Sequence, residues 1–255
     1  MTYKTAQIAK LIGVHPNTIR FYEEMGLLPV IPRTKSGYRI FNDRHLEQLR
    51  LLRTAFRAEI ISSRLRQEVL EIVKTAASDD IDGAYLGTQN YLEHLKEEKA
   101  GAEEAIRITL DIIGNSSTQD ENRVLISRKE TAGILGITTD VLRDWERNGL
   151  IQVPRHSNGF RKYGLKEIER LKIIRTLRSA HYSMMSILRM LNRLDNGEMN
   201  IREVINTPGE DEDIVCAADR YMTALSMAEK DALEMMAILD DILFLSKAWE
   251  GEYEF

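Results

Sequence analysis

The sequence predicts a mainly helical protein in which one unit occurs twice and each copy is followed by a long helix. The 255-residue chain repeats itself: GVHPNTIRFYEEMGLL at 13–28 corresponds to GITTDVLRDWERNGLI at 136–151, and LEQLRLLRT at 46–54 corresponds to IERLKIIRT at 168–176. The copies are offset by 123 residues, and by 122 from Pro32 onward, so one residue was lost in a loop. A period this long indicates a duplicated domain and not a solenoid.

Each copy opens with two short helices joined by a tight turn. Apolar stripes predict these helices in the first copy, from Ile8, Ala9, Leu11 and Ile12, and then from Ile19, Tyr22 and Met25. Gly13 lies in the turn, Pro16 stands at the first helical position, where a missing N–H costs nothing, and Gly26 ends the second helix. In the second copy, Ser127 and Glu130 have the spacing of a capping box.

A hairpin signal follows the two helices in both copies. Ser36-Gly37 and Asn158-Gly159 each lie between residues that favour strands. Two helices with a glycine-containing turn are a helix-turn-helix, and the added hairpin makes each copy a winged helix-turn-helix.

The same residues resemble the DNA-binding unit of MerR-type transcription regulators. TIRFYEEMGLL followed by GYR and an aromatic residue carries the resemblance; the second copy is a looser match, with Asp144-Trp145 in place of Phe21-Tyr22. The resemblance implies that the helix beginning at His15 enters the major groove. It also implies that Arg39 of GYR grips phosphate, and that promoter DNA is bent and untwisted for RNA polymerase.

Candidate DNA contacts come from the second helix and the wing of each copy: His15, Asn17, Thr18, Arg20, Tyr22, Arg33 and Arg39, then Thr139, Arg143, Trp145, Arg155 and Arg161. Arginines recur at three matched positions, which favours DNA contact over ordinary solvated charge. Asp140 and Asp144 add negative charge to the second copy; Asp accepts from cytosine N4 but repels phosphate. The second copy therefore reads a different half-site or binds less tightly, unless Asp144 pairs with a nearby Lys or Arg.

Charge alternates along the chain in step with the repeat. Residues 1–75 hold 13 Lys and Arg against 7 Asp and Glu, and residues 123–194 hold 15 against 6. The segments after them are acidic, with 3 against 11 at 76–122 and 4 against 16 at 195–255, so the net charge of −5 hides two basic blocks. Basic blocks that coincide with the repeated motif indicate phosphate attraction.

Two long proline-free stretches predict long helices at 84–113 and 214–245. The second has a strict heptad seam of Tyr221, Leu225, Ala228, Ala232, Met235, Leu239 and Ile242. The first has a weaker one, of Leu92, Leu95, Ala102, Ile106 and Ile113, which Lys99 and Thr109 interrupt. The predicted organisation is a winged unit at 1–75, a long helix at 76–113, a linker at 114–122, a second winged unit at 123–194, and a second long helix with an aromatic tail at 195–255.

The linker GNSSTQDEN is short, yet it suffices to pair the two long helices within one chain. It spans at most about 30 Å when extended, and in an antiparallel pair the far end of the first helix lies beside the unit of the second. We therefore expect a monomeric pseudo-dimer in preference to a homodimer.

Other residue classes argue against enzymes, metal sensors and membrane proteins. A single cysteine, Cys216, is expected to be buried and structural, and the five histidines lack metal-ligand spacing, so no metal or cofactor is expected. No nucleophile or carboxylate constellation is visible, and no apolar run approaches a membrane span, so the expected location is cytoplasmic. Methionines and aromatics late in the chain favour core packing over an effector site; that site would include Tyr221, Met222, Met235, Trp249 and Tyr253.

These observations predict a sequence-specific transcription regulator that bends promoter DNA and responds, if to any effector, to a hydrophobic small molecule. The alternative is an architectural or excisionase-like protein that bends DNA without an effector. A drug- or metabolite-binding module is compatible with the first interpretation, since sensing and DNA binding can share one chain.

Overall fold

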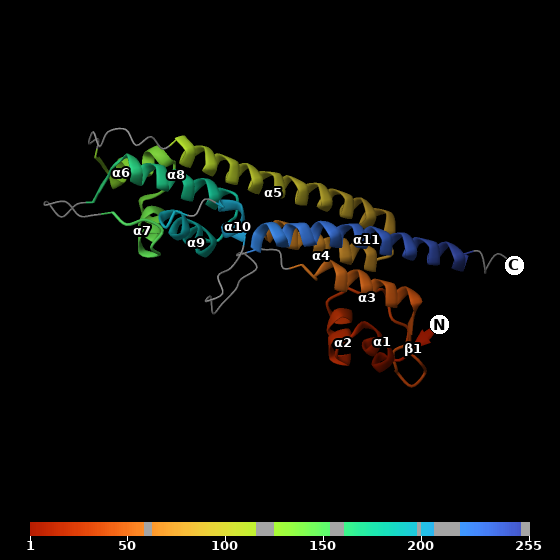
Figure 1. Cartoon of the computed structure of the whole chain (residues 1–255). Helices are drawn as coiled ribbons and strands as arrows, with labels where there is room; N and C mark the ends of the chain where they lie inside the picture. Colours follow the sequence, from red (N-terminus) through yellow and green to blue (C-terminus); the bar gives the residue numbers. More distant parts are fainter. Residues whose placement is uncertain (59–62, 116–124, 154–160, 198–199, 207–219, 251–255) are drawn as a thin grey trace. The chain divides into compact units, whose positions relative to one another are not determined.

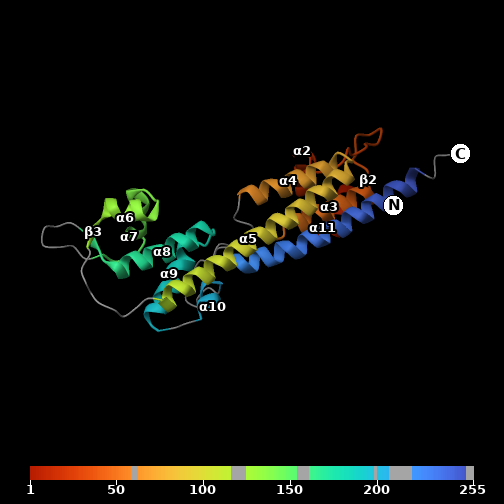
Figure 2. The ribbon, with the colours of Figure 1, turned by 90° about the horizontal axis from the view of Figure 1, so that it is seen from above.

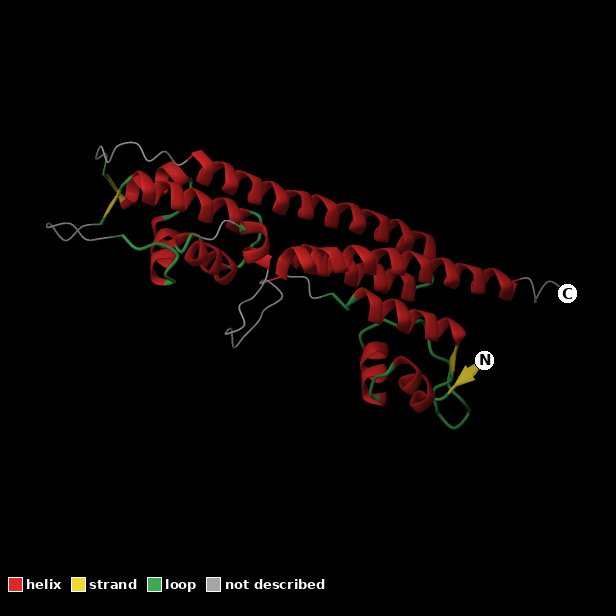
Figure 3. Ribbon diagram, in the orientation of Figure 1, coloured by secondary structure: helices red, strands yellow, loops and turns green. Residues whose placement is uncertain are grey.

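The protein is described by a computed structural model that covers residues 1–58, 63–115, 125–153, 161–197, 200–206 and 220–250. Helices make up most of these residues, and the strands form two short antiparallel pairs (Figure 3). The mainly α fold is therefore confirmed. The chain divides into two compact units, the first of Met1–Glu97 with Ala224–Phe255 and the second of Glu98–Thr223.

The first unit contains the first winged copy. It opens with β1 (Thr2–Tyr3), α1 (Thr5–Ile12) and α2 (Pro16–Glu24), and β2 (Phe41–Asn42) pairs with β1. The helices α3 (Asp43–Ala55) and α4 (Ser63–Ala77) follow, then α5 (Ile81–Asn115), which belongs to this unit as far as Glu97. From Ala224 onward α11 (Tyr221–Glu250) joins them, and α4, α5 and α11 lie side by side (Figures 1 and 2).

Two residues expected on buried stripes are exposed. Leu11 is 60 % exposed because only Ile8, Ala9 and Ile12 face the core of the winged copy, while Leu11 borders a hollow between α1, α3 and α11. Met25 is 49 % exposed because it lies just after the last residue of α2, and it lines a second hollow beside α3. The core positions Ile8 and Ile19 are confirmed as fully buried.

The second unit repeats this order. It contains β3 (Ile126–Ser127), α6 (Arg128–Leu135), α7 (Thr139–Arg147) and β4 (Lys162–Tyr163), with β3 and β4 paired. The helices α8 (Leu165–Ser179), α9 (Met184–Asp195) and α10 (Ile201–Asn206) follow. Sequence analysis did not separate α4, α9 and α10 from their neighbours, and the boundaries it gave to the domains remain predictions.

The heptad seam of α11 is confirmed, since all seven of its residues are at most 1 % exposed. The seam of α5 differs from the expected one. Of the expected residues, Leu95, Ala102 and Ile106 are buried, whereas Leu92 and Ile113 are only half-buried. The heptad spacing runs through the buried residues Ile81, Ala84, Thr88, Tyr91, Leu95, Ala102, Ala105 and Thr109, with the half-buried Glu98 between Leu95 and Ala102. Thr109 continues this seam, because its hydroxyl donates to the carbonyl of Ala105 at 2.8 Å and leaves a methyl group to pack.

The burial of α11 predicts a position-specific loss of stability. Leu239→Ala, at a fully buried seam position, should lower the free energy of unfolding by about 2–5 kcal/mol, as large-to-small core changes do. Leu233→Ala on the same helix is the matched control, since Leu233 is 57 % exposed and should cost less than about 0.5 kcal/mol. Urea unfolding followed by circular dichroism measures both; equal losses would contradict the seam assignment.

Candidate nucleic-acid interface

The second helix of each copy is fixed by its turn and its N-cap. Gly13 adopts the left-handed conformation (φ 74°) that ends α1, and the Nδ1 of His15 accepts the backbone N–H of Asn17 at 3.1 Å. In the second copy Gly136 has the same conformation (φ 63°), and Thr138 caps α7 by accepting the N–H of Val141 at 3.2 Å. The predicted turn, the N-terminal proline and the Ser127–Glu130 capping box are confirmed.

The outer faces of α2 and α7 carry matched arginines. Arg20 is exposed and donates to the side-chain oxygen of Asn17 at 3.1 Å. Its counterpart Arg143 is 54 % exposed and forms an ion pair with Asp140, which replaces Asn17, at 2.6 Å. Both helices therefore present an arginine at this position. Its described side-chain partner is the amide of Asn17 in the first copy and the carboxylate of Asp140 in the second.

One glutamate of α2 joins that helix to the wing in the first copy. The wing is a tight turn in which Gly37 adopts φ 84°, and a β-bridge connects Arg33 with Arg39. Glu23 accepts from Arg39 at 2.5 Å and from Arg33 at 3.1 Å. Both wing arginines are therefore held beside the second helix, and the expected hairpin is confirmed for this copy.

The second copy uses the matching glutamate with a different set of partners. Glu146, whose side chain is 6 % exposed, binds Arg161 of the wing at 3.2 Å and Arg128 of α6 at 2.8 Å. The hydroxyl of Tyr163 also donates to Glu146, and burial together with this hydrogen bond raises the pKa of Tyr163. The Asn158-Gly159 turn lies outside the described residues.

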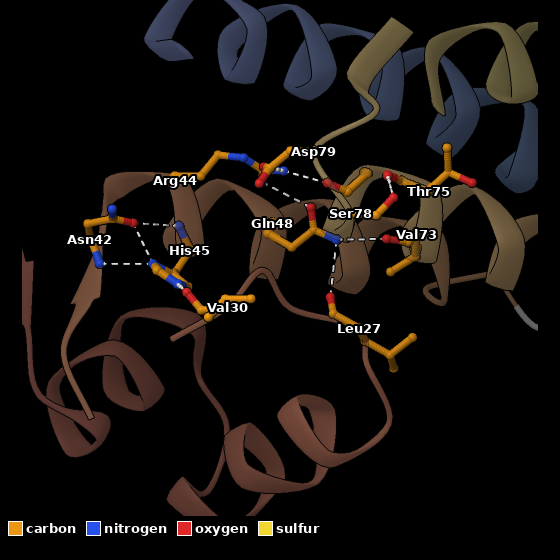
Figure 4. Close-up of polar contacts among 11 residues, drawn as sticks. Leu27, Val30, Asn42, Arg44, His45, Gln48, Val73, Thr75, Ser78 and Asp79 are labelled. Atoms are coloured by element: carbon orange, nitrogen blue, oxygen red, sulfur yellow. Dashed lines mark hydrogen bonds and ion pairs between the residues drawn. The ribbon is translucent and has the colours of Figure 1, made fainter. Parts of the chain in front are cut away.

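A polar network holds the first winged copy against α4 (Figure 4). The amide nitrogen of Gln48 donates to the carbonyls of Leu27 at 3.1 Å and Val73 at 2.9 Å, which joins the end of the helix-turn-helix to α4. Arg170 occupies the same position in the second copy and donates to the carbonyl of Leu150, the counterpart of Leu27, at 2.8 Å. In both copies a side chain of the helix that follows the wing is therefore hydrogen-bonded to the end of the helix-turn-helix.

The predicted contact residues fall into three classes. Side chains that are exposed or half-exposed on the second helices and wings are His15, Asn17, Thr18, Arg20, Tyr22, Arg33, Arg39, Thr139, Arg143 and Arg161. Trp145 is a correction: it is 5 % exposed and packs in the core of the second copy, where its large ring gains more from burial than from solvent. Arg155 lies outside the described residues.

Sequence reasoning missed two arginines at the same surface, Arg128 and Arg147. It weighted arginines that recur in both copies, and the counterparts of these two are Thr5 and Glu24. A comparison of the two copies for positions at which only the second has a positive charge would have found them. The pairing of Asp144 with a nearby cation, which the sequence left open, occurs with Arg147 at 3.7 Å.

The predicted effector residues do not form one site. The Tyr221 hydroxyl donates to Glu98 at 2.7 Å and its ring packs edge-on against Tyr182, while Met235 is fully buried fourteen residues further along α11, about 21 Å away at the rise of a helix. Met222 is half-buried. The Trp249 side chain, Tyr253 and Cys216 lie outside what the structure describes.

Two absences hold for the described part of the chain. There, no helix is long and apolar enough to cross a membrane, and no group of three or more His, Cys, Asp or Glu side chains could hold a metal ion.

Known proteins match both copies. The family of MerR regulatory proteins matches residues 4–41, and the family of MerR HTH regulatory proteins matches residues 126–194. The HTH-type transcriptional regulator YfmP of Bacillus subtilis (strain 168) is 32 % identical over 111 residues, 43 % of this chain and 76 % of that protein. The chain belongs to the MerR family. Because the two matches fall on the two repeats, the MerR helix-turn-helix unit is present twice, in a family of transcription regulators and not of enzymes.

Other MerR relatives share shorter segments. A protein of Haemophilus influenzae (strain ATCC 51907 / DSM 11121 / KW20 / Rd) described as "Probable heavy metal-dependent transcriptional regulator" is 38 % identical over 76 residues, 29 % of this chain and 59 % of that protein. The chain spans 38 % and 37 % of the next two relatives. The crystal structure of HiNmlR, a MerR family regulator lacking the sensor domain, bound to promoter DNA, aligns at 26 % identity and a TM-score of 0.29, over 55 % of this chain and 96 % of that chain.

The network around α3 predicts a pH dependence of the first MerR unit. His45 is 3 % exposed, and burial lowers its pKa below the usual value of about 6.5. As the pH falls, His45 is therefore protonated more readily in the unfolded chain than in the folded one, which favours unfolding. The contribution of neutral His45 to the free energy of unfolding should be complete above about pH 7 and decrease as the pH falls through 6.5.

Thermal unfolding between pH 7.5 and 5.5 tests this dependence. The loss of melting temperature on acidification should be smaller in His45→Gln than in the wild type, whatever the change in absolute stability. His15→Asn, which changes an exposed histidine and keeps a favoured N-cap residue, should retain the wild-type slope. An unchanged slope in His45→Gln would refute the assignment.

Proposed function

We propose that this MerR protein regulates transcription at promoters by bending and untwisting DNA, with each winged unit contacting one half-site. One observation carries the proposal: in both copies a single glutamate of the second helix, Glu23 or Glu146, holds a wing arginine beside that helix. Helix and wing then approach DNA as one body. The proposal includes RNA polymerase as a partner and a cytoplasmic location, where promoter DNA is found.

The arrangement suits the energetics of DNA distortion. Bending a site of 20–30 base pairs by 40–90° costs on the order of 1–6 kcal/mol, which backbone contacts must offset. Arg20 and Arg143 supply such contacts from the helices, and Arg39 and Arg161 supply them from the wings. Because the carboxylate holds the wing in place, the wing resists displacement by the force that distorted DNA exerts on its phosphate contact.

The expected pseudo-dimer is supported by contacts inside the first unit. Arg57, at the end of α3, donates to Asp231 of α11 at 2.6 Å and also to Glu234, and the hydroxyl of Thr54 donates to Glu234 at 3.2 Å. The helix that follows the second copy in sequence thus packs on the first copy of the same chain. In a homodimer of singly copied chains, a second subunit would have to supply that helix.

The effector remains a hydrophobic small molecule in this proposal, but its place is constrained. The side chains of Tyr221 and Met235, two residues that were expected to bind the effector, are buried in the core. The first unit instead has an apolar hollow of about 740 Å³ that exposes Phe21, Met25 and Phe56. The alternative, an architectural or excisionase-like DNA-bending protein, requires no effector and predicts DNA bending without a change in transcription from the bound promoter.

The DNA-contact assignment predicts separable effects of helix and wing arginines. Arg39→Ala should weaken binding to all duplexes and reduce the salt slope by about 1, as loss of one phosphate contact does. Arg20→Ala should do the same if it contacts phosphate, or cost about 1–3 kcal/mol on the operator alone if it reads guanine. Footprinting of the protein's own promoter supplies the operator for anisotropy titrations.

The matched control is Arg107→Ala, since Arg107 is 62 % exposed on α5 and its ion-pair partners among the described residues, Glu104 and Asp111, belong to the same helix. It should leave DNA affinity unchanged. Wild-type affinity in both Arg20→Ala and Arg39→Ala would overturn the assignment.

Intramolecular pairing predicts the solution mass. Light scattering should give a particle near the chain mass of 29.3 kDa, and one chain should bind one operator duplex. Asp231→Ala with Glu234→Ala should weaken the contact to Arg57 and raise proteolytic sensitivity without changing the mass. A stable particle of twice the chain mass that persists on dilution would contradict the pseudo-dimer.

A further inference from the structure

The surface that surrounds Glu146 differs in charge from the matching surface of the first copy. It is a hollow of about 460 Å³ lined by four arginines, Arg128, Arg143, Arg147 and Arg161, and two acids, Asp140 and Glu146. Its formal charge is +2, from four cations and two anions. The matched six positions of the first copy hold Thr5, Asn17, Arg20, Glu23, Glu24 and Arg39, which sum to zero.

Two of the differences between the copies add three positive charges, and the change from Asn17 to Asp140 removes one. Arg128 stands where the first copy has Thr5, and Arg147 stands where it has Glu24. Arg147 is 76 % exposed and reaches Asp144 only at 3.7 Å, so most of its donors face solvent. Arg128 is 25 % exposed and shares Glu146 with Arg161.

The acids in the hollow do not satisfy the arginines completely. Glu146 accepts from Arg128, Arg161 and the Tyr163 hydroxyl at once. The Nε of Arg161 is buried and has no hydrogen-bond partner among the described residues. Glu146 therefore does not satisfy the whole Arg161 guanidinium, and the exposed donors of Arg147 remain available to an anion that enters the hollow. Arginine matches the geometry of phosphate oxygens.

We infer that this hollow is a phosphodiester clamp specific to the second copy, and that Arg128 and Arg147 make the second copy the stronger holder of the DNA backbone. The inference rests on the proposed DNA-binding function. It argues against weaker DNA binding by the second copy, because, relative to the first copy, the positive charge gained at Arg128 and Arg147 outweighs the negative charge of Asp140 and Asp144. The first copy has the apolar Phe21, 53 % exposed, where the second has Asp144. The clamp therefore adds affinity for any sequence.

DNA backbone is favoured over an acidic protein segment by the position of the hollow. Its arginines come from the first helix, the second helix and the wing, the three elements that meet at Glu146. Phosphate contacts fix register without reading sequence, whereas base edges specify. Loss of clamp arginines should therefore lower the affinity for every duplex by the same factor.

Exchange of residues between the copies in the full chain tests the clamp. Arg128→Thr with Arg147→Glu gives the second copy the residues of the first, and Glu24→Arg gives the first copy one residue of the second. Anisotropy titrations use a random-sequence 30-base-pair duplex and the footprinted operator, at KCl concentrations from 50 to 200 mM. The double variant should reduce the salt slope by about 2 and keep the operator-to-random affinity ratio, and Glu24→Arg should increase the slope by about 1.

The outcomes separate the clamp from the proposed function. Wild-type protein that binds neither duplex would refute DNA binding itself. Wild-type protein that binds both, with a double variant of unchanged slope and unchanged melting temperature, would overturn the clamp alone. If the double variant is unstable, the gain of slope in Glu24→Arg decides: no gain overturns the clamp.

Discussion

The carboxylate of Glu23 or Glu146 is the constraint on which the geometry of each DNA-binding unit depends. It lies on the inner edge of the second helix, and the wing arginine can reach it only if helix and wing adopt one relative position. An acid as buried as Glu146, which is 6 % exposed, would be unfavourable without these partners, since an unpaired buried charge is strongly destabilising. The same group therefore stabilises the unit and orients the cations that we propose contact DNA.

The duplication removes a requirement that a single-unit protein must meet through a second chain. The contact of Arg57 with Asp231 joins the first winged copy to the helix that follows the second copy. Because the two partners are tethered, their effective concentration is high and does not fall on dilution. In the proposed arrangement each copy serves one half-site, so the two copies are free to diverge, and the difference between Glu24 and Arg147 is one such divergence.

The elements with strong local signals could be predicted from sequence, and the positions decided by tertiary contacts could not. Gly13, Pro16 and the α11 seam were predictable because a left-handed turn, a helix start and a heptad each have a residue signature. The α5 seam was obscured because Thr88 and Thr109 count as polar, although each hydroxyl is satisfied within its own helix. Trp145 was misassigned because it was counted with the DNA contacts of the second helix, although its counterpart Tyr22 lies on the apolar stripe that spacing places toward the core.

The two glutamates also differ in a way that bears on DNA distortion. Glu23 is 22 % exposed and holds two arginines of one wing, whereas Glu146 is 6 % exposed and joins three elements through Arg128, Arg161 and Tyr163. Solvent weakens the first arrangement more than the second, because charge interactions are stronger where water is excluded. The first wing can therefore exchange its carboxylate for a phosphate more readily, while the second stays rigid. The second copy therefore has the residues of a fixed backbone anchor in the DNA-bending function proposed above.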